Sequence, residues 1–132
     1  MKRRSFIASA AALLALPTLA SAEGFTDYTP GAIKAALDSG KTVLVDYSAT
    51  WCSTCKRQER VINALRAADP AYDANLTFIK VDWDTYSRHD VTQSRNIPRR
   101  STLIVLRGDQ ELGRIIAGTA ESQIKALMDT AL

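Results

Sequence analysis

The chain has 132 residues, of which 46% are hydrophobic and 23% are charged. This length suits one compact domain, and this composition excludes a disordered tail. The net charge of +3 comes from Lys2, Arg3 and Arg4, because residues 23–132 hold 14 basic and 14 acidic side chains. That balance argues against a nucleic-acid partner. Two cysteines and one histidine exclude a disulfide-dense scaffold and make a complete zinc site within one chain hard to build.

The first 22 residues have the three-part layout of a secretory signal peptide. A positively charged N-terminal region precedes an apolar run at 6–16, and an A-x-A pattern of small residues ends at Ala22. The apolar run is much shorter than the roughly 20 residues that span a bilayer, which favours cleavage over a membrane anchor. We therefore expect cleavage after Ala22, export to the periplasm and a domain over 23–132. Residues 2–7 also resemble the twin-arginine export signal, although two arginines can equally serve as a general positive start.

The first half of the remaining sequence alternates between helix and strand patterns. Thr29 is the predicted N-cap of a helix with Pro30 at its first position, and Gly40 closes that helix. Residues 42–48 are β-branched and apolar at almost every position, which predicts a central strand buried on both faces. Residues 52–68 then form a long predicted helix with its apolar side chains on one face.

The second half completes an α/β pattern. A second buried strand is predicted at 76–82, and the polar segment 84–95 predicts a short helix. Strands at 101–106 and 111–117 are predicted to be antiparallel, because the link between them is of hairpin length. Thr119 is the predicted cap of a final helix. This order of elements implies a mixed sheet with helices on both faces.

Both cysteines lie in one motif, Cys52-Ser53-Thr54-Cys55, between a buried strand and a long helix. The first turn of a helix brings the two sulfurs within bonding reach, so a reversible disulfide can form. Cys52 is expected at the N-terminal end, where the helix dipole lowers a thiol pKa from about 8.5 to about 7 or below. Cys55 is expected one turn inside and shielded. We predict that Cys52 attacks a partner disulfide and that Cys55 resolves the mixed disulfide.

Three other interpretations of the cysteine pair compete with this one. A static structural disulfide is possible in an exported protein, but so short a loop removes little chain entropy and stabilises little. Half of a zinc site would need two more ligands, for which His89 is the only good candidate. The third alternative is an inert buried pair.

Two segments around the motif resemble the thioredoxin family. Residues 43–56, with the sequence VLVDYSATWCSTCK, are similar to that family's strand and active-site segment, and 76–82 are similar to its next strand. The resemblance covers nearly all of 23–132. It implies a thioredoxin fold, which is a central mixed β-sheet flanked by helices on both faces, and thiol–disulfide exchange. No metal or organic cofactor is expected, because the cysteine pair itself carries two electrons.

Two further positions, Asp46 and Lys80, carry over from the resemblance. Asp46 lies six residues before Cys52, where the family keeps a buried carboxylate. Because Asp46 interrupts an apolar strand, we expect desolvation to raise its pKa, and a proton acceptor there would help Cys55 to become a nucleophile. Lys80 matches the family's lysine that approaches this carboxylate, and a buried structural ion pair is the alternative. Trp51 is expected at the surface beside the cysteines, with a core tryptophan as the alternative.

The sequence departs from the family at one important point. The family has a cis-proline directly before the threonine that begins the third strand, facing the disulfide and pairing with the substrate backbone. Either Pro98 matches it and extra residues follow, or Ser101 occupies the proline position. In both cases Arg99 and Arg100 should lie close to the disulfide. They could stabilise the Cys52 thiolate, contact an acidic partner, or remain solvated loop charges.

We therefore expect a monomeric, periplasmic oxidoreductase that reduces protein disulfides and receives electrons from a membrane thiol carrier. The Ser53-Thr54 pair lacks the imidazole found in many oxidants, which favours a reductase, whereas the paired arginines favour the opposite direction. Neither a nucleic acid nor a metal is expected as a partner. A disulfide-forming oxidase, or a binding or chaperone module in which the disulfide is incidental, remains an alternative.

Overall fold

The fold is built on one five-stranded mixed sheet. The computed structural model describes residues 24–132, so the predicted signal peptide and its cleavage site lie outside the described residues. The strands lie in the order β1-β3-β2-β4-β5, with β1, β3 and β2 parallel and β4 and β5 antiparallel to their neighbours. This arrangement confirms the predicted mixed sheet. The strands are β1 (Thr26–Asp27), β2 (Thr42–Ser48), β3 (Thr77–Asp82), β4 (Thr102–Arg107) and β5 (Gln110–Ile116).

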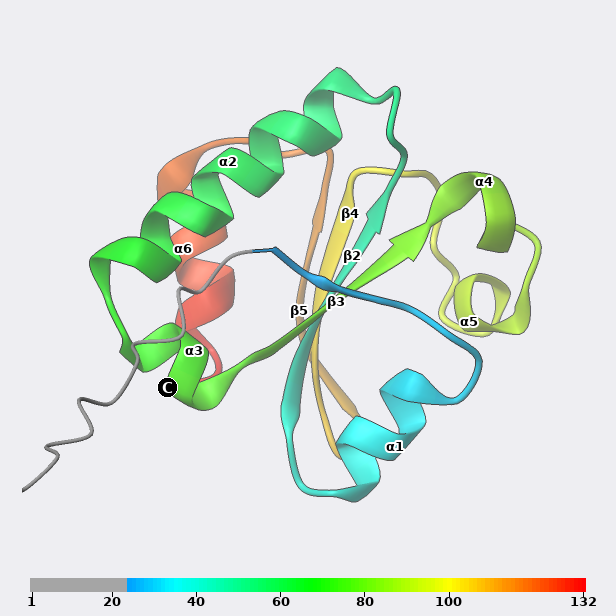
Figure 1. The fold of residues 1–132 in the computed structure, drawn as a ribbon, viewed down its shortest axis with the longest axis horizontal. Helices are drawn as coiled ribbons and strands as arrows, with labels where there is room; N and C mark the ends of the chain where they lie inside the picture. The colour runs from blue at the N-terminus through cyan, green and yellow to red at the C-terminus, as the bar shows by residue number, and fades with distance from the viewer. Residues whose placement is uncertain (1–23) are drawn as a thin grey trace, which may run out of the picture.

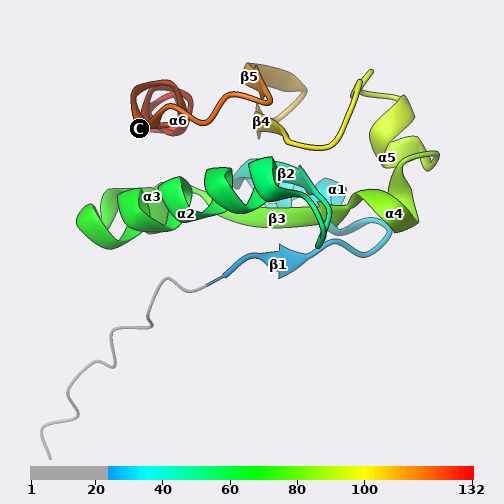
Figure 2. The same ribbon diagram turned by 90° about the horizontal axis from the view of Figure 1, so that it is seen from above.

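Helices cover both faces of this sheet, as predicted. Figure 1 shows α2, α3 and α6 on one side of the strands and α1, α4 and α5 on the other, and Figure 2 shows the strands from above in the order β5 to β1. Within the described residues, no helix has the length and apolar character needed to cross a membrane. The helices are α1 (Ala32–Asp38), α2 (Ser53–Ala68), α3 (Ala71–Asn75), α4 (Trp83–Tyr86), α5 (Asp90–Gln93) and α6 (Glu121–Asp129).

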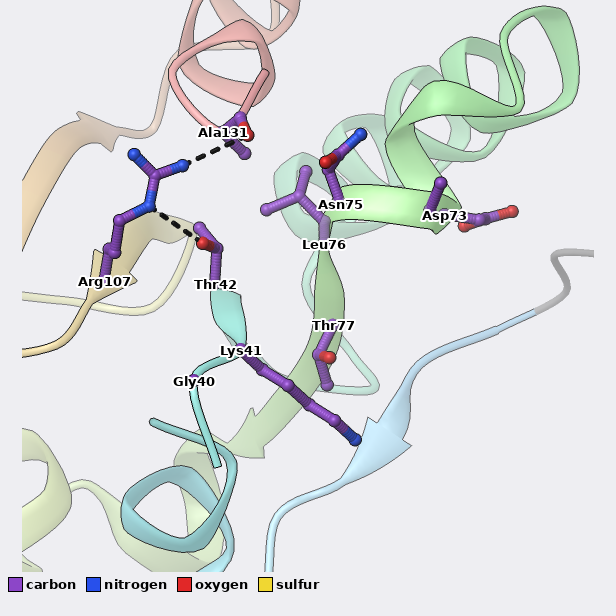
Figure 3. A pocket seen from close by; sticks show the side chains of 10 residues that line it. Gly40, Lys41, Thr42, Asp73, Asn75, Leu76, Thr77, Arg107 and Ala131 are labelled. Carbon is purple, nitrogen blue, oxygen red and sulfur yellow. Dashed lines mark hydrogen bonds between the residues drawn. The ribbon is translucent and has the colours of Figure 1, made fainter. Parts of the chain in front are cut away.

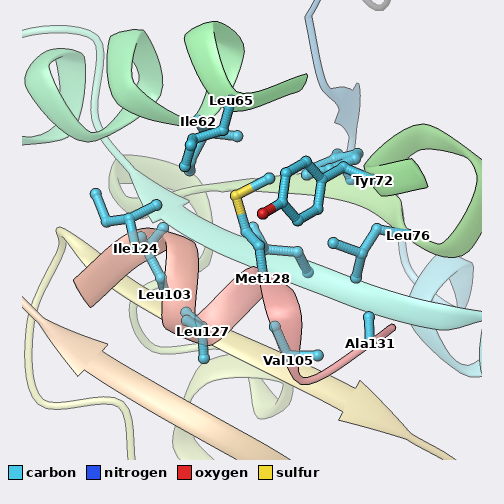
Figure 4. Packing of buried hydrophobic residues seen from close by; sticks show 12 residues of the cluster. Ile62, Leu65, Tyr72, Leu76, Leu103, Val105, Ile124, Leu127, Met128 and Ala131 are labelled. Carbon is cyan, nitrogen blue, oxygen red and sulfur yellow. The ribbon is translucent and has the colours of Figure 1, made fainter. Parts of the chain in front are cut away.

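Strand β2 separates two hydrophobic cores, and all seven of its residues are buried. Successive side chains of a strand point to opposite faces, so Leu44 enters the core beneath α2 and α6, whereas Val43 and Val45 enter the core beneath α1. Figure 4 shows the first core, where Ile62 of α2 lies near Met128 of α6. This double burial explains why the sequence of β2 is largely apolar. It also leaves the single carboxylate of the strand inside the protein.

Several predicted helix boundaries were wrong by a few residues. Helix α1 begins at Ala32 rather than at Pro30, because the preceding residues form a turn in which the Ala32 N–H donates to the Thr29 carbonyl at 2.9 Å. Gly31 is the N-cap and has φ of 87°, a left-handed conformation that glycine adopts without steric cost. The final helix begins after Ala120, so Thr119 is not its cap.

The segment predicted as one short helix at 84–95 is two helices. Helix α4 begins after Asp82, whose carboxylate accepts from the Thr85 N–H at 3.1 Å. Helix α5 begins after His89, whose Nδ1 accepts from the Val91 N–H at 3.1 Å. The two-residue strand β1 and the five-residue helix α3 were not predicted, since elements this short leave little periodic signal.

Candidate active site

The two cysteines form a disulfide at the N-terminal end of α2, directly after β2. Cys52 is the N-cap residue, with an extended backbone, and its sulfur accepts from the Cys55 N–H at 3.1 Å. The Cα atoms of the two cysteines are 5.3 Å apart, which is within the usual range for a disulfide. The predicted geometry is therefore confirmed. One otherwise unpaired N–H of the helix terminus already points at the sulfur expected to carry negative charge.

The disulfide is almost completely buried, and only one of its two cysteines is exposed at all. Cys52 is 3% exposed and Cys55 is fully buried, and both pack against Ala49 and Trp83. Trp51 is 56% exposed beside them, which confirms its predicted surface position. The small exposure that remains at the disulfide belongs to Cys52, which agrees with the predicted division of roles between the two cysteines.

Ser101 occupies the position facing the disulfide. Its Oγ lies 3.2 Å from the Cys52 sulfur and 3.0 Å from the Cys55 sulfur, and the side chain is fully buried. Pro98 is exposed, and no peptide bond within 24–132 is cis. The two alternatives left by the sequence are thus resolved: Ser101, not Pro98, stands where the family's proline would face the cysteines.

The backbone of Ser101 is held firmly by its neighbours. Its N–H donates to the Tyr47 carbonyl of β2 at 2.7 Å. Its own carbonyl accepts from the Ala117 N–H at 2.8 Å and from Gln58 Nε2 of α2 at 2.9 Å. These bonds keep the residue at φ of 63°, in the left-handed region that non-glycine residues rarely adopt.

The two arginines before Ser101 lie along the exposed side of the site. The Arg100 guanidinium stacks over the Trp51 ring with its central carbon 4.5 Å from the ring centroid. The Trp51 Nε1–H donates to both carboxylate oxygens of Asp84, at 3.0 and 3.1 Å. Arg99 donates from Nε to the Arg100 carbonyl at 3.1 Å, and its own carbonyl accepts from Thr102 Oγ1 at 2.8 Å. Arg100 is therefore part of the rim beside the cysteines.

Asp46 is fully buried on β2, on the same face as Leu44 and therefore towards α2. Neither of its carboxylate oxygens has a hydrogen-bond partner among the described residues. Burial raises the pKa of Asp46 from 3.8 to about 7, with Lys80 lowering it and Glu59 raising it to lesser extents. The expected rise is confirmed, and desolvation is its main cause. The carboxyl group can therefore take up or release a proton near neutral pH.

Lys80 is paired differently from the expectation. It is the register partner of Asp46 across β2 and β3. Its ammonium group, however, donates to both carboxylate oxygens of Glu59 on α2, each at 3.0 Å. The alternative of a structural ion pair between Lys80 and Asp46 is therefore wrong, because Glu59 competes successfully for the lysine. Lys80 and Glu59 both line a pocket of about 250 Å³ beside α2, the helix that carries Cys55.

Sequence reasoning missed Gln58 and Glu59, which are consecutive residues of α2 and point to different neighbours. Gln58 is fully buried at a position four residues before Ile62, so helical spacing placed it on the apolar face. A polar side chain on that face is a usable signal of a buried hydrogen-bond network. Glu59 lies four residues after Cys55, and nothing in the sequence indicated that the helix would place it against Lys80.

A larger pocket, of about 470 Å³, lies at the opposite end of the sheet, where β2 begins (Figure 3). The Arg107 guanidinium in this pocket already donates to Thr42 Oγ1 at 3.0 Å and to the Ala131 carbonyl at 3.1 Å. The cysteines follow the other end of β2, so this pocket takes no part in their chemistry. The described part of the chain holds no group of three or more histidine, cysteine or acidic side chains arranged to bind a metal.

Comparison with known proteins agrees with this geometry. The family model described as Thioredoxin matches residues 27–130. The chain therefore belongs to the thioredoxin family, and its disulfide, buried aspartate and mixed sheet occur in the arrangement that the sequence resemblance implied.

Individual relatives are distant but cover most of the fold. The chain is 29% identical to Thioredoxin H2-1 of Oryza sativa over 90 residues, covering 68% of this chain and 60% of the relative, so it spans about three fifths of that protein. It is 39% identical to Thioredoxin-2 of Saccharomyces cerevisiae over 82 residues, covering 61% of this chain and 73% of the relative. The crystal structure of Trxlp from Edwardsiella tarda is 38% identical, with a TM-score of 0.67 over 82% of this chain and 98% of that chain.

Proposed function

We propose that this protein is a thiol–disulfide oxidoreductase that reduces disulfides in protein clients. The observation that carries the proposal is the placement of Cys52 as the N-cap of α2, with Cys55 one turn inside and sealed. A helix terminus favours the thiolate, and the thiolate is the nucleophile in disulfide exchange. A disulfide that served only to stabilise the fold would gain little from so short a loop.

The reaction proceeds in two exchanges. The Cys52 thiolate attacks one client sulfur, so the client S–S bond breaks, a mixed disulfide forms, and the released client thiolate takes a proton from solvent. Cys55 then gives its proton to a base and attacks the Cys52 sulfur. The Cys52–Cys55 disulfide forms and the second client thiolate leaves. The client gains two electrons and the cysteine pair loses two.

Asp46 is our candidate for the base in the second exchange. A buried carboxyl with a pKa raised to about 7 accepts a proton near neutral pH far better than an ordinary aspartate does. It lies on the face of β2 that is covered by α2, the helix that carries Cys55. Lys80 and Glu59 act on this carboxyl through their opposite charges rather than by contact with the sulfurs.

Clients are proposed to bind across the rim formed by Trp51, Arg100 and Ile116. Trp51 and Ile116 are the exposed large hydrophobic residues of the rim, and Ile116 is the register partner of Thr102, next to Ser101. Exposed apolar side chains beside a reactive sulfur suit an extended client segment. Arg100 adds a positive charge at the same edge, which favours clients with acidic residues near their cysteines.

We further propose that the protein works in the periplasm. The support is the signal-peptide layout of residues 1–22. In that compartment the oxidised cysteine pair must be reduced again after each turnover, and a membrane thiol carrier is the proposed electron source. Fractionation of the native host, with and without residues 2–22, tests the location. Recovery of the full-length protein in the cytosolic fraction alone would count against it.

Insulin reduction with dithiothreitol as electron donor tests the activity. We expect turnover by the unaltered protein and none above background for Cys52→Ser. Ser122→Ala, at an exposed position of α6, is a surface control that should keep full turnover. Unchanged turnover in Cys52→Ser would reject Cys52 as the nucleophile, and no turnover by the unaltered protein would favour a binding module. The reduction potential measured against glutathione then decides the direction, and a value above about −150 mV would favour a disulfide-forming oxidase over a reductase.

A further inference from the structure

The hydroxyl of Ser101 touches both reacting sulfurs at once. Its Oγ is 3.2 Å from the Cys52 sulfur and 3.0 Å from the Cys55 sulfur. Neither sulfur carries a hydrogen in the disulfide, so the hydroxyl is the donor in these contacts. Its single hydrogen is therefore shared between two sulfurs, and a small rotation about the Cα–Cβ bond directs it to either one.

The backbone of Ser101 is strained in a way that keeps this hydroxyl in place. A non-glycine residue at φ of 63° is in a left-handed conformation that carries a steric cost. Three hydrogen bonds, from its N–H to Tyr47 and to its carbonyl from Ala117 and Gln58, outweigh that cost. Such strain persists where surrounding structure over-determines a residue, and it concentrates at functional sites. Glycine would fit this backbone better, so the side chain itself needs an explanation.

We propose that the Ser101 hydroxyl is a catalytic group of this site, donating its hydrogen bond to whichever of the two sulfurs carries negative charge. This inference rests on the proposed oxidoreductase function and adds a residue to its machinery. In the reduced protein the hydroxyl supports the Cys52 thiolate together with the Cys55 N–H. In the mixed disulfide, Cys52 is bonded to the client and uncharged, so the hydroxyl turns to the Cys55 thiolate that forms as its proton leaves.

Burial makes this hydrogen bond strong. The side chain of Ser101 is fully buried, so water does not compete for the sulfurs on this side. Hydrogen bonds to ionised groups are roughly twice as strong as those between neutral groups. A bond of that kind shifts a thiol pKa by about one to two units. Because it stabilises the thiolate, which belongs to the reduced form, it also makes the reduction potential less negative.

Two substitutions of Ser101 distinguish the effect of the hydroxyl from the effect of the strained backbone. Both Ser101→Ala and Ser101→Gly remove the hydroxyl, but only glycine relieves the left-handed strain. We expect both variants to raise the pKa of the Cys52 thiol by at least one unit, followed through the thiolate absorbance of the reduced protein. We also expect both to lower, by up to tenfold, the equilibrium constant for reduction of the protein disulfide by glutathione. This change corresponds to a reduction potential that is more negative by up to about 30 mV.

Thr102→Val is the matched control. Thr102 is a second fully buried hydroxyl residue, next to Ser101 at the start of β4, and its Oγ1 donates to the Arg99 carbonyl at 2.8 Å rather than to a sulfur. We expect its Cys52 pKa and its potential to equal those of the unaltered protein. Thermal unfolding of the oxidised variants reports any loss of fold separately from the thiol titration.

The outcomes divide cleanly. A raised Cys52 pKa in both Ser101 variants but not in Thr102→Val supports the hydroxyl. An unchanged pKa and potential in Ser101→Gly would overturn the proposal, as would an equal change in Thr102→Val. Failure of the proposed function is a different result: the unaltered protein would then show no insulin reduction, whatever its Ser101 variants do to the thiol titration.

Discussion

Replacing Asp46 by asparagine tests the electrostatics of the site. The amide has nearly the shape of the protonated carboxyl but cannot ionise. Ionising Asp46 inside the protein is costly, because burial raises its pKa from 3.8 to about 7. At 1.36 kcal/mol for each pKa unit, this shift means that the folded protein loses about 4 kcal/mol of stability when Asp46 is ionised.

The sign of the pH dependence follows from where the proton binds. Between pH 4 and 7 the folded protein holds a proton on Asp46 that the unfolded chain has released. Unfolding therefore becomes easier as pH rises through this window, and the effect levels off above the folded pKa. We expect Asp46→Asn to match the unaltered protein near pH 4 and to exceed it in the free energy of unfolding by about 4 kcal/mol at pH 8.

Denaturant unfolding of the oxidised proteins at a series of pH values measures this difference. Asp38→Asn is a suitable control, because Asp38 is exposed and forms its ion pair with Lys34 on the surface of α1. Its stability should follow that of the unaltered protein from pH 5 to 8. A difference between Asp46→Asn and the unaltered protein that stays constant with pH, or that reverses in sign at pH 8, would refute the reasoning.

Three further predictions concern the neighbours of the cysteine pair. The Glu59 carboxylate both holds the Lys80 ammonium and raises the pKa of Asp46. Glu59→Gln removes this charge, so an NMR titration should place the Asp46 pKa below about 7. No decrease in that pKa would contradict the proposed competition. Gln58→Leu removes the side-chain donor to the Gly118 carbonyl and one of the two donors to the Ser101 carbonyl, and should lower the free energy of unfolding by about 2 kcal/mol; a loss smaller than about 0.5 kcal/mol would count against it. Trp51→Ala should raise KM for insulin several-fold with little change in kcat, whereas a change confined to kcat would exclude a client-contact role.

The sequence predicted the parts of this protein that carry strong local patterns. The β-branched, largely apolar segment 42–48 predicted the central strand β2 with the bounds that the structure shows. The position of Cys52 directly before a long helical pattern predicted an N-cap cysteine. Asp46 was singled out because it stands where the thioredoxin family keeps a buried carboxylate and because it interrupts an otherwise apolar strand. These predictions rest on spacing within a single element, which the sequence displays directly.

The remaining features depend on how separate elements meet. The partner of Lys80 is Glu59, and that pairing requires the rotation of α2 against the sheet, which no local pattern specifies. The choice between Pro98 and Ser101 depended on the path of a loop whose length alone fits both alternatives. The signal peptide, the periplasmic location and the membrane electron donor remain predictions.

Trapping the mixed disulfide tests the division of labour between the two cysteines most directly. Reduced Cys55→Ser protein is mixed with a disulfide-containing client such as insulin, and adducts are mapped by mass spectrometry. Cys52→Ser serves as the reciprocal variant. We expect a stable client adduct on Cys52 in Cys55→Ser and almost none on Cys55 in Cys52→Ser, since Cys55 is fully buried. Adducts forming at equal rates on the two cysteines would contradict the proposed mechanism.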